Sequence, residues 1–335
     1  MLPRIKPAAM GRRFKPEALL RRIKYLILGK ELDKGLLFKA FIYLILTTTA
    51  YIYINPILYM ISTMVKTPKD LLDPTVIWIP SSIFYGHLEN ALQAIRYSVT
   101  AWRSLGLAVS TALLQCVSCA VAGYAFARLQ FPFKKFWFGC LLVTLIMPAQ
   151  VIIIPTIIFI SRLKNFAYIT DLTQTLGIDI SYLMMILPAA FGHGISGALF
   201  VIIFRQFFLT QPKELEEAAK IDGASVFRIF TRVLYPLAKP AILVVFLFSF
   251  VWVWNDFYYP SMYMSGKDVV YPLATAMRTL STEINVLIEL GEMSEIEAEP
   301  VKMAASFLVI LPPLLLYTFA QKWFVESVER TGIVE

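Results

Sequence analysis

KELEEAAKIDGAS, residues 213–225, is a polar island between two long apolar runs of the sequence. Its three glutamates favour the positive end of a helix dipole, and Pro212 suits the first position of that helix. Gly223 is expected to end the helix as a left-handed cap, and Ser225 to cap a second helix that Pro236 stops. The island therefore predicts a helical hairpin suited to docking another protein. On periodicity alone, a connector that merely keeps a loop soluble is equally acceptable.

The composition is that of a membrane protein with several spans. Of the 335 residues, 58% are hydrophobic and 16% are charged, whereas about 25% are charged in soluble domains. The net charge of +8 comes largely from basic residues before the first apolar run, where they meet anionic lipid head groups, so nucleic acid is not an expected partner. The three cysteines lie in apolar runs and are interpreted as packing residues, and neither histidine has the neighbours of a metal site.

Six apolar runs are each long enough to cross a bilayer as a helix, which takes about 20 residues. The expected spans cover about residues 38–63, 104–127, 136–160, 182–208, 240–263 and 303–324. The positive-inside bias places the basic N-terminus, the C-terminus and the polar island in the cytoplasm. The long loops 66–103 and 264–301 then face outside, and short helices are expected in the first. The sequence predicts an all-α integral membrane fold with six transmembrane helices and cytoplasmic N- and C-termini.

One membrane domain with short appendages accounts for the chain. Residues 1–37 are expected to form a cytoplasmic basic segment with a helix in the head-group region. A cleaved signal peptide is the alternative, but the segment lacks a small-residue cleavage site. Residues 38–325 form the expected transmembrane domain, which includes the loop 210–239, and residues 326–335 form a cytoplasmic tail.

Some spans contain residues that interrupt helices. Pro148 and Pro155 predict a kink in the third span, and the glycine-rich GHGISG at 192–197 predicts close helix packing with a flexible spot in the fourth. The G-x-S-x-G spacing of a hydrolase nucleophile elbow fails there. No G-x-x-x-x-G-K-[ST] phosphate loop occurs in the sequence, so the chain is not expected to be its own ATPase.

The fifth span ends in a cluster of aromatic and polar residues. Asp256 lies about 24 Å along the helix from Pro240, in the outer part of the bilayer, where a charge needs a partner or water. One interpretation is an aromatic belt with a solvated helix end. The other is a sugar-facing patch, in which aromatic faces cover a pyranose and polar groups bind its hydroxyls. The candidates for such a substrate path are Trp252, Trp254, Asn255, Asp256 and Tyr258.

The island resembles the E-A-A-x3-G-x9-I-x-L-P signature of ATP-binding-cassette importer permeases. It carries the E-A-A triplet at 217–219 and the glycine at 223, while Val233 and Tyr235 replace the isoleucine and the leucine. Three further segments are similar to the carbohydrate-uptake, maltose-type branch: FRQFF at 204–208, DGAS at 222–225 and WNDF at 254–257.

This resemblance implies the type I importer fold and a permease subunit that imports an oligosaccharide or sugar derivative. It implies four kinds of neighbour in a bacterial or archaeal cytoplasmic (inner) membrane: a second homologous permease, two ABC ATPase subunits, an extracytoplasmic solute-binding protein and membrane lipid. ATP and magnesium are expected on the ATPase subunits, with no cofactor, metal or catalytic residue in this chain. The coupling residues that the resemblance implies are Glu216, Glu217, Ala218, Ala219, Asp222, Gly223, Ala224 and Ser225.

Three alternatives remain at this stage. An importer permease for a solute other than a sugar would carry the same docking loop. An ion-coupled secondary transporter needs paired ionisable residues within its spans and often has inverted repeats, of which the sequence offers little. A membrane enzyme needs a catalytic constellation, and none is recognised in the sequence.

Overall fold

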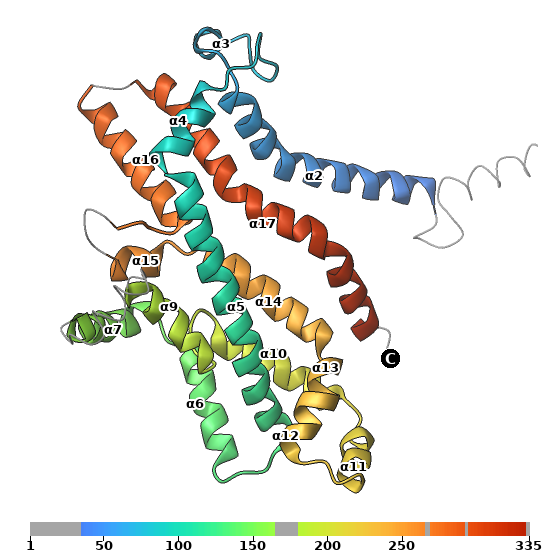
Figure 1. Ribbon diagram of the computed structural model, residues 1–335. Helices are drawn as coiled ribbons and strands as arrows, with labels where there is room; N and C mark the ends of the chain where they lie inside the picture. Colours follow the sequence, from blue (N-terminus) through green and yellow to red (C-terminus); the bar gives the residue numbers. More distant parts are fainter. Residues whose placement is uncertain (1–34, 165–179, 265–268, 292–293, 333–335) are drawn as a thin grey trace, which may run out of the picture. The chain divides into compact units, whose positions relative to one another are not determined.

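The computed structural model describes residues 35–164, 180–264, 269–291 and 294–332 (Figure 1). Every regular element within these residues is a helix. The chain divides into two units at Ser62, so each unit is described by itself. The expected head-group helix falls on residues 1–34 and lies outside the described residues. The domain bounds expected at residues 37 and 325 stay predictions.

The first unit is represented by α2, Leu36–Met64, whose last residues pass into the second unit. An 18-residue window of this 29-residue helix has a mean hydropathy of 1.6, and Pro56 lies inside the helix. A helix of this length spans about 44 Å at 1.5 Å per residue, which exceeds the thickness of a bilayer core. The helix expected over residues 38–63 is therefore present.

The second unit is built around α5, Tyr97–Arg128, which contains the expected span 104–127. Two buried residues of its small-residue stripe, Cys119 and Gly123, let neighbouring helices approach closely. A Cβ added to Gly123 would lie 2.6 Å from the Cβ of Phe204, so only glycine fits at this crossing. The helices packed along α5 are α9, Ile180–Ala190, α10, Gly197–Thr210, and α14, Lys239–Trp254.

The loops expected to face outside contain helices in the structure. The first holds α3, Pro68–Leu72, and α4, Gly86–Ala94, as expected. The second holds α16, Leu273–Glu289, which was not expected. Only one stripe of α16 is buried, including Leu273, Leu280 and Ile284, so the segment lacks the continuous apolar run of a span. The sixth expected span lies within α17, Glu295–Gly332, and the expected tail begins inside the same helix.

The third, fourth and fifth expected spans are interrupted. The third divides into α6, Lys134–Ile146, and α7, Ala149–Lys164. The fourth divides into α9 and α10, and the fifth into α14 and α15, Tyr258–Tyr263. Among the described residues three helices, α2, α5 and the first part of α17, are long and apolar enough to cross a membrane alone. If each bent pair of helices counts as one span, the number is five; the pairs are Lys134–Ile146 with Gln150–Arg162 and Val226–Leu237 with Lys239–Trp254. The count of six spans stays a prediction.

Candidate functional site

The polar island forms the expected helical hairpin at one end of the second unit (Figure 1). Its first helix is α11, Glu214–Ile221, and Gly223 follows it with φ +76°, the left-handed conformation that glycine adopts without strain. The Oγ of Ser225 accepts a hydrogen bond from the backbone N–H of Arg228 at 3.3 Å. This bond caps α12, Val226–Ile229, so both predicted turn residues have the predicted local geometry.

Both proline predictions in the hairpin are wrong. Pro212 lies before the N-cap residue Lys213 and not at the first helical position. Pro236 does not stop the second helix, which passes through a π-helical turn, Phe230–Leu234, into α13, Tyr235–Leu237. Pro236 follows the π-helical turn, where the backbone already departs from the regular i→i−4 hydrogen-bond pattern, so the helix continues past it. The chain bends by 75° only after Leu237, where α14 begins.

Apolar side chains hold the second half of the hairpin to α5 and α10. Ile229, Phe230 and Leu234 are buried. The Phe230 ring lies 5.2 Å from the ring centre of Tyr124 in α5 and 6.2 Å from that of Phe208 in α10. Aromatic pairs at these distances add to the energy of area burial. The hairpin is therefore packed onto the ends of two long helices.

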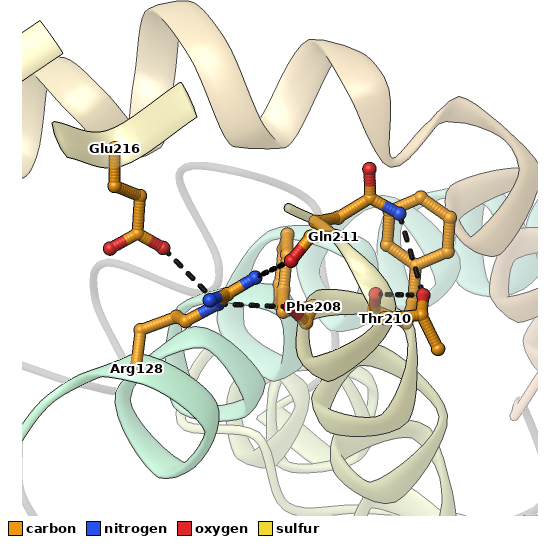
Figure 2. A network of polar contacts seen from close by, with 6 residues as sticks. Arg128, Phe208, Thr210, Gln211 and Glu216 are labelled. Carbon is orange, nitrogen blue, oxygen red and sulfur yellow. Dashed lines mark hydrogen bonds and ion pairs between the residues drawn. The ribbon is translucent and has the colours of Figure 1, made fainter. Parts of the chain in front are cut away.

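One buried ion pair attaches the first half of the hairpin (Figure 2). The Nε of Arg128, the last residue of α5, lies 3.1 Å from Oε1 of Glu216, and the two side chains are 6% and 10% exposed. The same Nε donates a hydrogen bond to the carbonyl of Phe208 at 2.9 Å, and the guanidinium also donates to the carbonyl of Gln211. Arg128 thereby joins α5, the end of α10 and α11.

Sequence reasoning missed Arg128, because its partner lies far away in the chain and no local pattern links them. It grouped Glu216 with the exposed coupling residues, but the structure places its carboxylate inside. The other predicted coupling residues lie at the surface: Ala219 and Ala224 are half-buried, and the exposed ones are Glu217, Ala218, Asp222, Gly223 and Ser225. We call these exposed residues the docking face of the hairpin, after the role predicted for them.

The predicted substrate-path residues point in different directions. Trp254 is 2% exposed, and its Nε1 donates to the carbonyl of Val309 at 3.0 Å, so it holds α14 to α17. Trp252 stacks on Phe200 with the ring centres 5.4 Å apart. Asn255 is exposed and donates back to its own helix, and Tyr258 is half-buried. Of the five, Asp256 lines a cavity between described helices of the second unit.

That cavity has a volume of about 390 Å³. Asp256 lies between α14 and α15, where its Oδ1 accepts the backbone N–H groups of Tyr258 at 2.9 Å and Tyr259 at 3.3 Å. Sequence reasoning did not identify the other polar residues of the lining, although the glycine-rich run 192–197 was a signal for part of it. These residues are Thr111, Thr144, Thr156, His193, Ser196, Tyr259 and Tyr263.

Side chains of α5 fix the interruption between α9 and α10. Gln115 is fully buried; its Nε2 donates to the carbonyl of Ile195 at 3.1 Å, and its Oε1 accepts a hydrogen bond from Ser249. Ser118 donates to the carbonyl of Ala189. A Cβ on Gly197 would lie 2.5 Å from the carbonyl oxygen of Gly192. The expected flexible spot is therefore a compact, hydrogen-bonded loop.

Comparison with known proteins gives one family and several relatives. The family described as binding-protein-dependent transport system inner membrane component matches residues 120–330. The sn-glycerol-3-phosphate transport system permease protein UgpE of Pectobacterium atrosepticum is 28% identical over 74% of this chain and 81% of that protein. The osmoprotective compounds uptake permease protein GgtD of Synechocystis sp. is 28% identical over 86% of this chain and 89% of that protein.

A solved structure agrees with the fold. It is that of a bacterial ABC transporter involved in the import of the acidic polysaccharide alginate. The likeness covers 86% of this chain and 96% of the solved chain, with a TM-score of 0.68 and 18% sequence identity.

Proposed function

Because the chain belongs to the family of binding-protein-dependent transport system inner membrane components, and is therefore a permease subunit of an ATP-binding-cassette importer, we propose that its cargo is a carbohydrate or a sugar derivative. One relative supports a sugar-derivative cargo, since its name specifies sn-glycerol-3-phosphate, a phosphorylated polyol. The WNDF segment at 254–257, similar to carbohydrate permeases, supports it as well. The chain works in a bacterial or archaeal inner membrane with a second homologous permease, two ATPase subunits and a solute-binding protein.

The observation that carries the coupling part of the proposal, as distinct from the cargo, is the two-sided hairpin. Its docking face presents Glu217, whose carboxylate can accept a charge-assisted hydrogen bond from an arginine or lysine of an ATPase subunit. The small side chains of Ala218 and Ala219 allow the partner to approach the helix closely. ATP and magnesium bind to the ATPase subunits. This chain therefore transmits their movement and does not hydrolyse ATP.

The inner side of the hairpin transmits the movement. When the ATPase subunits close, α11 and α12 are displaced together, because both are packed on the same helix ends. The ion pair between Arg128 and Glu216 and the ring contacts of Phe230 pass that displacement to α5 and α10. Packed helices switch between discrete arrangements, so the displacement reorients the path between inward-open and outward-open states.

Labelling of introduced cysteines tests the orientation on which this function depends. Ile221 is 86% exposed on the hairpin, and Leu72 is 69% exposed on α3. In sealed right-side-out vesicles, a membrane-impermeant maleimide should label Leu72→Cys and leave Ile221→Cys unlabelled until the membrane is opened. The parent chain gives the background from its own cysteines. Labelling of Ile221→Cys from outside would place the hairpin where cytoplasmic ATPase subunits cannot contact it, and the proposed function would be wrong.

A further inference from the structure

Three interrupted helices of the second unit meet at one cavity. The interruption between α6 and α7 contributes Met147 to the lining, that between α9 and α10 contributes residues 193–196, and that between α14 and α15 contributes Asp256. Within a bilayer, non-helical backbone is tolerated only where it is buried in protein or lines a water-containing cavity. Discontinuous helices also supply the binding sites of membrane transporters, because they expose backbone polar groups at membrane depth.

Unusual backbone conformations and a buried side-chain hydrogen bond maintain the interruption between α9 and α10. Gly192 and Gly194 adopt φ values of +70° and +121°, which other residues rarely adopt, and Ser196 has φ +57°. The buried amide of Gln115 is committed to the carbonyl of Ile195 and so holds the loop in place. A simple continuous helix would need none of these features. The interruption is therefore built into the structure and keeps polar groups at the cavity wall.

The groups at the wall define the chemistry of a ligand. Asp256 brings a carboxylate whose Oδ1 is occupied by two backbone N–H groups, so Oδ2 is the oxygen offered to a ligand. Tyr259 and Tyr263 line the same cavity. A hydroxyl-rich ligand can donate to the carboxylate and lie against the rings. A phosphate or carboxylate beside Asp256 meets like-charge repulsion.

We propose that this cavity is a solute-binding site within the chain, and that it takes an uncharged polyhydroxyl compound of the size of a mono- or disaccharide. Asp256 is its hydroxyl acceptor and its discriminator against anions. The volume of about 390 Å³ lies in the lower part of the range of about 300–1,000 Å³ typical of ligand sites. The inference rests on the proposed function and narrows its cargo, since two compared proteins are named for anionic solutes, sn-glycerol-3-phosphate and alginate.

The first experiment tests the charge of the cavity without any knowledge of the solute. In the assembled transporter, Ser196→Cys is labelled with a cationic and an anionic methanethiosulfonate, and the ratio of the two rates is measured. Asp256→Asn keeps an oxygen for the N–H groups of Tyr258 and Tyr259 but removes the charge. It should lower the cation-to-anion ratio about tenfold, whereas Glu283→Gln, at an exposed position of α16, should leave it unchanged. An unchanged ratio in Asp256→Asn would overturn the proposal.

The second experiment uses maltose and maltose 6-phosphate as matched probes. Maltose should slow the labelling of Ser196→Cys at least threefold, maltose 6-phosphate should not, and Asp256→Lys should reverse the preference. Equal or better protection by the phosphorylated sugar overturns the ligand class, and protection by neither sugar overturns the site. If ATP-driven sugar uptake persists in either case, the proposed function stands without this site. If the intact transporter takes up no carbohydrate, the proposed function itself fails.

Discussion

Glu216 and Glu217 are neighbours in the sequence, but they lie on different sides of α11. The carboxylate of Glu216 is buried beside Arg128, while Glu217 is exposed on the docking face. The Oε1 atom of Glu216 faces Arg128 as an ion pair without hydrogen-bond geometry, and no other described residue donates to it. Its charge is therefore balanced by Arg128. Disturbing this buried pair is expected to affect folding, whereas replacing Glu217 is expected to affect ATPase binding.

Replacing Arg128 by glutamine should destabilise the chain, because it leaves the carboxylate of Glu216 buried without a partner. Removing one member of a buried ion pair costs about 3–5 kcal/mol, whereas removing both charges is often nearly neutral. The double variant Arg128→Gln with Glu216→Gln should therefore recover the yield of folded protein, measured by size-exclusion chromatography. Its uptake per ATP hydrolysed should stay below that of the parent chain. Equal loss of yield in the single and double variants would contradict this account.

Replacing Glu217 by alanine should leave folding intact and weaken the hold on the ATPase. A hydrogen bond to a charged group contributes about 1.5–3 kcal/mol, so retention of the ATPase subunits should fall roughly tenfold or more. The retention of the ATPase subunits is measured by co-purification from detergent. Glu214→Ala is the matched control, since Glu214 is exposed on the first turn of the same helix. If both variants lose the ATPase equally, the effect belongs to the net charge of the hairpin and not to Glu217.

At the scale of the helices, local signals were sufficient for the turn of the hairpin, but not for the roles of its two prolines or for the spans. The left-handed Gly223 and the cap at Ser225 follow from single-residue preferences, and the structure contains both. The interruption at 192–197 depends on Gln115 of another helix, so a hydropathy average over the fourth span cannot reveal it. Hydropathy also failed to predict α16, because only one stripe of this helix is buried.

Gly223 is the position at which the hairpin depends most on backbone conformation. A Cβ there would meet nothing within 4 Å, so a substitution acts through φ +76° and not through a clash. Gly223→Val should therefore distort the turn and abolish uptake, because a β-branched residue is strongly disfavoured at positive φ. Gly223→Asn is the control and should keep most of the uptake, since asparagine tolerates this conformation. Uptake and the amount of inserted protein are measured together, and normal uptake by Gly223→Val would contradict the role of the turn.

At the scale of the whole second unit, α5 connects the two ends of the proposed mechanism. Arg128 at its last turn holds the hairpin, and Gln115, 13 residues earlier and about 20 Å along the helix, holds the loop at the cavity. Sequence alone placed both residues in or beside one span, but not their partners. Both partners lie on other helices or loops, and only the packed structure brings them together.

This arrangement predicts that Gln115→Leu impairs transport without weakening the binding of the ATPase subunits. The substitution leaves the carbonyl of Ile195 and the hydroxyl of Ser249 without their partner, at about 1–3 kcal/mol for each buried group. The hairpin is untouched, so ATPase retention should equal that of the parent chain, while uptake should fall at least tenfold. Ser249→Ala is the matched control that removes only the hydrogen bond to Oε1 of Gln115 and keeps the bond from Nε2 to Ile195, so it shows which bond matters. Loss of ATPase retention in Gln115→Leu would mean that the variant disrupts the packing of α5 as a whole, and the division of roles along this helix would be wrong.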